Sequence, residues 1–190
     1  MRLEETKILL RALAFAAEKH RFQKRKDTTG TPYINHPINV ALTLAEIGEE
    51  TDDDLLVAAI LHDTIEDTQT TPEEISTRFG PPVLSLVLEV TDDKNLPKEE
   101  RKQLQVLNAS KKSESARKLK LSDKICNVMD IIHHPPGNWS IERKQQYLSW
   151  AEQVLEGLRG TNLKLENKLR ELINEGRKVF TVAEASELAN

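Results

Sequence analysis

The sequence predicts an all-α protein with a single domain, and three observations lead to this prediction. The chain has 190 residues, which suffice for one domain with a substantial core but leave little room for two. Only 4% of the residues are aromatic and only seven are glycines, a composition that favours helices over sheets. Apolar residues also recur at helical spacing, without repeats, low-complexity stretches or a linker between segments.

Helices separated by short turns account for the first part of the chain. Residues 3–20 read as an amphipathic helix, and residues 21–36 then lose the helical periodicity and form a loop. A second helix is expected from Pro37, because proline suits the first turn of a helix. Thr51, followed by three aspartates, predicts the capped start of a third helix that runs through residues 55–65.

The rest of the chain contains further helices and ends in a tail. Thr71 and Glu74 match a capping box that opens a short helix ending at Gly80. The apolar segment 82–91 is interpreted as a buried helix, with a strand as the alternative. The remaining helices are expected over residues 97–109, 114–132 and 140–158, and from a cap at Thr161-Asn162 to about Lys178. We therefore expect one domain over residues 1–180 and a loose tail over residues 181–190.

Charge and cysteine content argue against several classes of protein. The net charge of −4 is unlike that of proteins built to bind nucleic acid, which usually carry a basic excess. The single cysteine, Cys126, allows neither a disulfide framework nor a cysteine-rich zinc site, and it is interpreted as a small buried residue. The acidic N-terminus lacks the apolar stretch of a signal peptide, and no stretch approaches a membrane span. We therefore expect a soluble, cytoplasmic protein without a membrane partner.

Two runs of basic residues interrupt this acidic background. Solvated faces are the ordinary interpretation of both runs, and for the second run it is the preferred one. The first run consists of His20, Arg21, Lys24, Arg25 and Lys26, and the second of Lys111, Lys112, Arg117, Lys118, Lys120 and Lys124.

The segment Leu61–Thr68 carries four ionisable groups at the end of an apolar helix. Glu66 follows His62 by four residues, and Asp67 follows Asp63 by four, so each pair would stack along one face if the helix continued. Burial of such carboxylates is unfavourable without a partner, and a divalent cation would neutralise them. A His-Asp pair alone is common, however, and is often only a histidine at a helix end beside a solvated acid.

Two further residues would complete a metal site. His36 lies where the loop meets the second helix, and Asp123 lies in a helix whose apolar stripe includes Leu121, Ile125 and Val128. Two imidazoles and two carboxylates suit manganese or ferrous iron, with zinc as an alternative. A metal would lower the pKa of a water held there, and the second acid pair would orient or deprotonate that water.

The order of these residues points to a known family. The pattern of His36, His62-Asp63 and Asp123 resembles the metal signature of the HD superfamily. The flanking sequence is similar to the hydrolase domain of RelA/SpoT-type proteins over roughly residues 8–175, and among these it resembles the small, stand-alone alarmone hydrolases, including the animal type. The segments that carry the resemblance are Arg25-Lys26-Asp27, Gly30–Pro37, Leu61–Thr68, Glu89–Lys94, Leu96–Lys98, Lys120–Asn127 and Trp139–Val154.

The resemblance implies the single-domain helical bundle of the HD superfamily and a manganese-dependent 3′-pyrophosphohydrolase that acts on ppGpp and pppGpp. It implies that the metal is bound by His36, His62, Asp63 and Asp123 and that Glu66 and Asp67 are catalytic. It also implies nucleotide, phosphate or ring contacts from Arg25, Lys26, Tyr33, Lys98, Asn127, Trp139, Arg143 and Tyr147.

Plainer interpretations of some of these residues stay open at this point. Asn127 follows Asp123 by four residues, so the two share one helix face. By contrast, Trp139 and Tyr147 could be core aromatics, and Lys98 and Arg143 could be ordinary surface cations, because the sequence gives these four residues no geometry of their own.

Two alternative functions also stay open. The loop before His36 departs from the common family sequence at Phe22 and at Thr28-Thr29, which bears on substrate preference. Removal of the 2′-phosphate of NADPH is one alternative, because this ligand also carries a phosphate on the ribose of a purine nucleotide. A catalytically inactive HD module that binds nucleotides is the other.

Overall fold

The structure of the chain is a computed structural model that describes the backbone of residues 3–188 and the side chains of residues 3–184. The described residues form helices and no strand; two isolated β-bridges join Lys24 to Pro32 and Asp27 to Pro136. The prediction of an all-α fold is confirmed. The helices are α1 (Leu3–Lys19), α2 (Asn35–Glu46), α3 (Asp53–Leu61), α4 (Thr64–Asp67), α5 (Pro72–Phe79), α6 (Pro81–Val90), α7 (Lys98–Asn108), the 3-10 turn η1 (Ala109–Lys111), α8 (Glu114–His133), α9 (Ile141–Leu158) and α10 (Leu163–Leu188).

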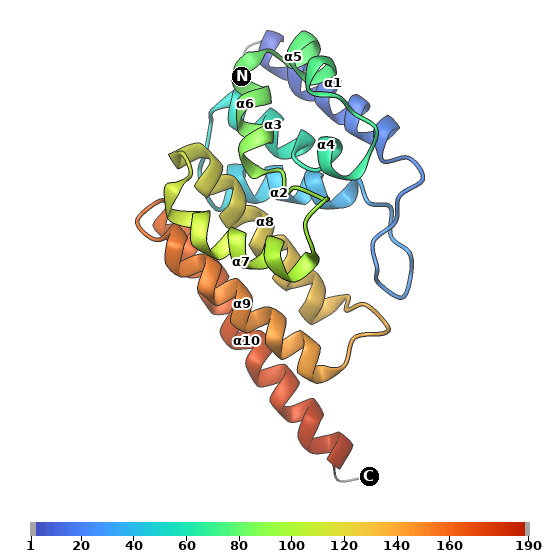
Figure 1. Cartoon of the computed structure of the whole chain (residues 1–190), viewed down its shortest axis with the longest axis vertical. Coiled ribbons are helices and arrows are strands. Elements are labelled where there is room, and N and C mark those ends of the chain that lie inside the picture. The colour runs from blue at the N-terminus through green and yellow to red at the C-terminus, as the bar shows by residue number, and fades with distance from the viewer. Residues whose placement is uncertain (1–2, 189–190) are drawn as a thin grey trace.

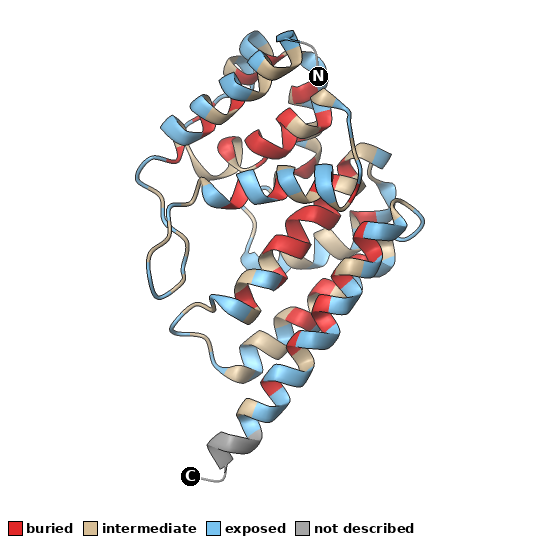
Figure 2. Cartoon of the chain, turned by 180° about the vertical axis from the view of Figure 1, so that it is seen from behind, coloured by how far each residue is buried: buried red, intermediate tan, exposed pale blue. Residues whose placement is uncertain are grey.

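Helix α8 lies at the centre of the bundle and packs against α2, α6, α9 and α10 (Figure 1). Every residue from Leu119 to Cys126 is buried, so this helix is enclosed on all sides along its middle (Figure 2). A helix buried all round normally consists of apolar residues. Here Ser122, Asp123 and Lys124 interrupt the apolar sequence, and their polar groups need partners inside the protein.

The remaining helices cover α8 from two sides. Helices α1, α3, α5 and α6 pack on one another at one end of the molecule, and α9 and α10 run antiparallel to each other at the other end (Figure 1). Gly80 joins α5 directly to α6 with a φ of +93°, a left-handed conformation that favours glycine. The apolar segment 82–91 is thus a helix, as expected, and the strand alternative is wrong.

The structure corrects the third predicted helix at both ends. The helix starts at Asp53 and its N-cap is Asp52, whose side chain accepts hydrogen bonds from the backbone N–H groups of Asp54 and Leu55; the predicted cap was Thr51. The helix also ends at Leu61 and does not continue to residue 65. A separate single turn, α4, follows it and carries the second acid pair.

The last helix is longer than expected. Helix α10 continues to Leu188, whereas the sequence predicted an end near Lys178 and a loose tail from residue 181. Residues 189–190 of that predicted tail lie outside the described residues. Within residues 3–188, no helix combines the length and the apolar character that crossing a membrane requires.

Three loops lie along the same side of the molecule. They connect α1 to α2, α6 to α7, and α8 to α9 (Figure 1). The bridge between Asp27 and Pro136 joins the first of these loops to the last. Segments that are far apart in the sequence therefore meet near the C-terminal end of α8.

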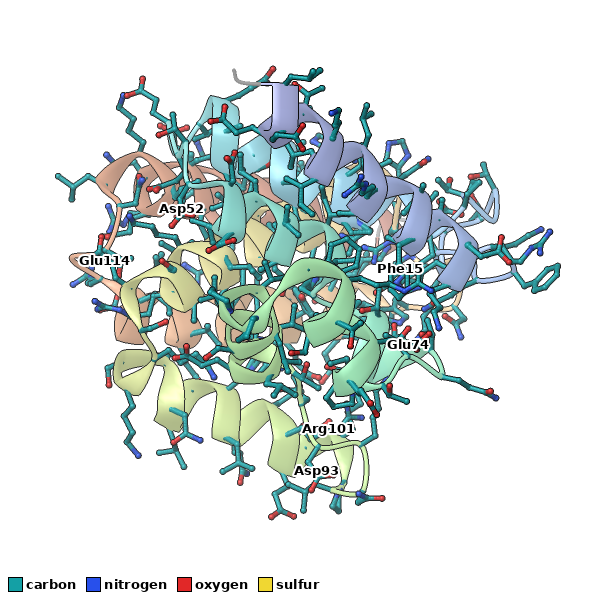
Figure 3. All side chains as sticks on the ribbon, turned by 90° about the horizontal axis from the view of Figure 1, so that it is seen from above. Phe15, Asp52, Glu74, Asp93, Arg101 and Glu114 are labelled. Carbon is teal, nitrogen blue, oxygen red and sulfur yellow. The ribbon has the colours of Figure 1, made fainter. Side chains whose placement is uncertain are left out.

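The corrected cap of α3 gives a test of the fold. We expect Asp52→Ala to lower the free energy of unfolding by about 1 kcal/mol, because two backbone N–H groups at the start of α3 lose their acceptor. Thr51→Ala, one residue earlier, should change it little. Urea unfolding of both variants measures this, and a larger loss for Thr51→Ala would contradict the cap. Asp52 lies far from the cavity-lining Arg101 in Figure 3, so the activity per folded molecule should stay unchanged.

Candidate active site

Four side chains from three helical segments converge beside α8. His36 comes from the first turn of α2, His62 and Asp63 from the junction between α3 and α4, and Asp123 from the middle of α8. The Nε2 atom of His36 lies 3.2 Å from Oδ1 of Asp123 and 3.7 Å from Oδ2 of Asp63. The Nε2 atom of His62 lies 3.1 Å from Oδ2 of Asp63 and 3.9 Å from Oδ1 of Asp123. The structure thus brings together the four residues expected to bind a metal.

The donor atoms of this cluster fit a divalent cation. His62 donates from Nδ1 to the carbonyl oxygen of Ala59 at 2.7 Å, which turns Nε2 toward the carboxylates. This Nε2 is buried, and although it lies 3.1 Å from Oδ2 of Asp63, it forms no well-aligned hydrogen bond among the described residues. One ligand atom each from His36, His62 and Asp123 lie within 4.8 Å of one another. Mixed nitrogen and oxygen donors at this spacing are suited to a transition-metal ion.

The charges of the cluster shift the pKa values of its own residues. Although burial disfavours the charged imidazole, the carboxylates of Asp63 and Asp123 raise the pKa of His62 to about 9. In turn, although burial disfavours the charged carboxylate, the imidazoles of His62 and His36 hold the pKa of Asp63 below its usual range. The two acids therefore stay ionised inside the protein, beside positively charged neighbours. A divalent ion at this position would also provide positive charge.

Neighbouring side chains hold the two carboxylates in place. The Tyr33 hydroxyl donates to Oδ2 of Asp63 at 2.6 Å. Asn127 donates from its amide to Oδ1 of Asp123 at 2.6 Å, as their shared helix face predicted, and Lys124 donates to Oδ2 at 2.8 Å. These bonds fix the orientation of the carboxylates, as outer partners of metal ligands usually do.

The second basic run is only partly a solvated face. Lys124 is 3% exposed and its Nζ atom lies 4.8 Å from the ring centre of Trp150. Lys120 is 8% exposed and donates to the carbonyl oxygen of Val90 at 2.9 Å. The prediction of a solvated face is wrong for these two lysines, because the helix that carries them is enclosed. Cys126 is buried, as expected, and burial raises the pKa of its thiol to about 12.

Glu66 and Asp67 do not stack on His62 and Asp63 along a continuous helix, because the helix is interrupted between the two pairs. Oε2 of Glu66 accepts from the backbone N–H of Asp92 at 3.0 Å, and burial raises the pKa of this side chain. Lys94 Nζ lies 2.6 Å from Oδ1 of Asp67 and 3.4 Å from Oε1 of Glu66. The interruption turns both acids toward the adjacent cavity, which they line.

This cavity has a volume of about 730 Å³ and opens along the three loops. The two acids and all eight residues expected to contact a nucleotide line it: Arg25, Lys26, Tyr33, Lys98, Asn127, Trp139, Arg143 and Tyr147. Tyr33 and Asn127 also bind the carboxylates of the cluster, so the cluster lies directly behind the cavity wall.

The structure places the aromatic and cationic residues whose interpretation stayed open in the cavity lining. Lys98 and Arg143 are exposed and lie close enough for their charges to interact: burial and the charges of Arg143 and Lys102 lower the pKa of Lys98. The Arg143 guanidinium lies 4.3 Å from the ring centre of Trp139, whose ring lies 5.9 Å from that of Tyr147. Both aromatics are half-buried members of the cavity wall and only partly core residues.

The cavity is richer in positive charge than the protein as a whole. Lysine and arginine side chains outnumber carboxylates in its lining, whereas the net charge of the chain is −4. Positive charges gathered closely enough to lower the pKa of Lys98 favour a bound polyanion. The site is thus suited to a ligand with several negative charges.

Arg25 connects the first loop to α8. Its guanidinium forms an ion pair with Asp130, donates to Oδ1 of Asn127 at 3.0 Å, and lies 5.5 Å from the ring centre of Tyr33. The turn beyond it is ordered by Asp27, whose Oδ1 accepts from the backbone N–H groups of Thr29, Gly30 and Thr31. The loop is therefore a fixed wall of the cavity.

Sequence reasoning missed several residues of the cavity. Arg101 and Lys102 follow Lys98 by three and four residues on α7, and Trp150 follows Tyr147 by three on α9, so helical spacing could have identified them. Figure 3 shows Arg101 at the edge formed by α7, near the loop that contains Asp93. Lys94 and Gln23 lie in loops and gave no such signal.

The chain is similar in sequence to known proteins. The sequence pattern of the HD domain matches residues 12–146. The chain is 51% identical to guanosine-3′,5′-bis(diphosphate) 3′-pyrophosphohydrolase MESH1 of Danio rerio over 92% of this chain and 97% of that protein. It is 53% identical to MESH1 of Homo sapiens over 88% of this chain and 93% of that protein.

A solved structure is similar as well. It is described as a metazoan ortholog of SpoT that hydrolyses ppGpp and plays a role in starvation responses. The TM-score is 0.86 at 48% sequence identity, and the match covers 88% of this chain and 94% of the other.

The cluster geometry predicts how metal affinity depends on charge. We expect Asp63→Asn to keep the fold but lose most bound manganese, because the substitution preserves shape and removes a negative charge beside both imidazoles. Metal analysis after dialysis measures this. Asp93→Asn is the matched control, since Asp93 is exposed and bonds only within its own loop. Unchanged manganese content in Asp63→Asn would contradict the site.

Proposed function

The chain belongs to the HD-domain family, and we propose that it hydrolyses the 3′-pyrophosphate of the guanosine alarmones ppGpp and pppGpp, releasing GDP or GTP and pyrophosphate. The observation that carries this proposal is the junction of the His/Asp cluster with a cationic cavity of nucleotide size. A metal centre alone would suit many hydrolases. The cationic wall selects for a substrate with several phosphates.

His36, His62, Asp63 and Asp123 would hold a divalent cation. Manganese is our choice, because two imidazoles and two carboxylates form an intermediate donor set, and ferrous iron or zinc would fit the same residues. A cation bound there supplies charge neutralisation at the phosphate and a water of lowered pKa. Tyr33, Asn127 and Lys124 would keep the carboxylates oriented during turnover.

Glu66 and Asp67 would handle protons. Both carboxylates line the cavity beside the cluster, and burial raises the pKa of Glu66, the direction that favours uptake of a proton by this group. In the reaction, a water oxygen bonds to the phosphorus attached to the ribose 3′ oxygen, and the bond between that oxygen and phosphorus breaks. One carboxylate would take the proton of the water, and the 3′ oxygen would receive a proton as it leaves.

The cavity residues would bind the two phosphate arms and the base. Lys98 and Arg143, with Arg101 and Lys102 nearby, form a cationic wall on α7 and α9 that would stabilise charge on the phosphates. Arg25 and Lys26 form the opposite wall on the first loop. A planar guanidinium can grip a phosphate or stack on a base, so Arg25 would serve either end of the nucleotide.

Product analysis tests the function directly. Manganese-loaded protein is incubated with ppGpp, pppGpp and NADPH, and the products are separated. We expect pyrophosphate with GDP or GTP from the first two. Faster release of phosphate from NADPH would instead support the 2′-phosphatase, and binding of ppGpp without turnover would support an inactive module.

Substitution of Glu66 and Asp67 tests whether these acids transfer protons or bind the metal. We expect Glu66→Gln and Asp67→Asn to retain near-stoichiometric manganese while the rate falls about a hundredfold or more, the scale of a lost acid–base group. Metal analysis and turnover are measured on the same samples. A loss of manganese equal to that of Asp63→Asn would make these residues metal ligands and overturn the assignment.

Arg25→Ala tests the position of the nucleotide. The Michaelis constant for ppGpp should rise with little loss of metal, because the change removes a binding contact. Added salt should weaken wild-type binding more than binding of the variant, since the screened attraction includes Arg25 itself.

Arg21→Ala is the matched control for this experiment. Arg21 belongs to the same basic run but pairs with Glu18 and does not line the cavity. The Arg21→Ala variant should bind ppGpp as tightly as the wild type does. Equally tight binding by Arg25→Ala at low salt would mean that the first loop does not contact the nucleotide.

A further inference from the structure

Gln23 lies between a buried histidine and one of the two acids of the cavity. Its Oε1 atom is 2.6 Å from Nδ1 of His20, and its Nε2 atom donates to Oδ2 of Asp67 at 2.9 Å. The contact with Asp67 joins residues 44 positions apart in the sequence. Gln23 is half-buried and also lines the cavity.

The chemistry of the partners fixes the orientation of this amide. An ionised carboxylate only accepts hydrogen bonds, so the NH₂ group of Gln23 must face Asp67 and its oxygen must face His20. His20 must therefore carry a proton on Nδ1. Because His20 is 2% exposed and its ring lies 5.0 Å from that of Tyr33, the group behind Gln23 is itself held in place.

The backbone of Gln23 is fixed as well. Its N–H donates to the carbonyl oxygen of His20 at 2.9 Å, and its carbonyl accepts from the N–H of Tyr33 at 3.0 Å. Main chain and side chain together hold Gln23 by four hydrogen bonds. The NH₂ group of this side chain points to the carboxylate of Asp67.

The second side chain that bonds to Asp67 is a charged lysine. Lys94 donates to Oδ1 of Asp67 at 2.6 Å, but its side chain is 48% exposed and it also approaches Glu66. A lysine at the edge of a cationic cavity is attracted by the phosphates of a bound polyanion. The neutral amide of Gln23 has no such competing attraction, so it can keep its bond to Asp67 when the substrate is present.

We propose that Gln23 is a positioning residue that holds the Asp67 carboxylate in its reactive orientation, with His20 holding Gln23. This inference rests on the proposed catalytic role of Asp67. It differs from a role in substrate binding, because a positioning residue changes the rate of the chemical step and acts only while Asp67 is present.

A double-mutant cycle tests the proposal. Gln23→Met keeps the length of the side chain and removes both hydrogen bonds. We expect the kcat for ppGpp to fall about tenfold, the scale of a lost hydrogen bond to a charged group, with KM within twofold of wild type and manganese content unchanged. In the Asp67→Asn background, the same substitution should cause no further loss, since the acid that Gln23 positions is already gone.

Two further variants sharpen the test. Gln23→Glu places a second carboxylate against Asp67 and should lower kcat more than Gln23→Met does, because like charges oppose the native orientation. Gln145→Met is the matched control: Gln145 also donates to a carboxylate, Oε2 of Glu184, but it does not line the cavity, so its kcat should equal that of wild type.

The outcomes separate this inference from the proposed function. Full activity of Asp67→Asn would show that Asp67 has no catalytic role and would remove the basis of both. If Asp67→Asn is impaired, an equal loss from Gln23→Met in both backgrounds would overturn the positioning role alone. A rise in KM without a change in kcat would also overturn it and make Gln23 a substrate contact. Melting temperatures of all variants identify any that fail to fold.

Discussion

The burial of Asp123 in the middle of α8 is the constraint on which the rest of the structure depends. A carboxylate 7% exposed inside an enclosed helix is costly unless other groups compensate for it. The compensation comes from Lys124 and Asn127 on the same helix and from His36 on α2. Burial of Asp123 therefore requires both that α2 packs on α8 and that the cluster residues gather around this carboxylate.

The interruption of the helix after Leu61 separates two functions that a continuous helix would have combined. In a continuous helix, Glu66 and Asp67 would lie directly above His62 and Asp63 and would compete for the same cation. Because α4 is a separate turn, its acids instead face the cavity and bond to groups from two loops. This local break allows one short segment to supply both the proposed metal ligands and the proposed proton carriers.

The sequence predicted most of the helices, and the residues that it singled out lie close together in the fold, for physical reasons. Periodicity and capping residues are local signals, and the capping box at Thr71 is present as expected. Residue types also singled out the expected metal ligands, and ligand atoms of three of them, His36, His62 and Asp123, lie within 4.8 Å of one another. Thr51 and Asp52 are both capping residue types, so the pattern could not decide between them. The break after Leu61 and the burial of Lys124 could not be predicted from local signals. They depend on tertiary contacts, as do the roles of Lys94 and Gln23, whose partners lie 27 and 44 residues away.

The loop between α1 and α2 has an inner edge whose residues bond to groups of the site and an outer edge whose residues do not. Gln23, Arg25 and Tyr33 bond to groups around the cluster, whereas Phe22 is 87% exposed and Thr28 and Thr29 do not line the cavity. The positions at which this loop departs from the common family sequence therefore belong to its outer edge. Substitutions at the outer edge can therefore change the surface of the loop without removing the bonds that Gln23, Arg25 and Tyr33 make at the site.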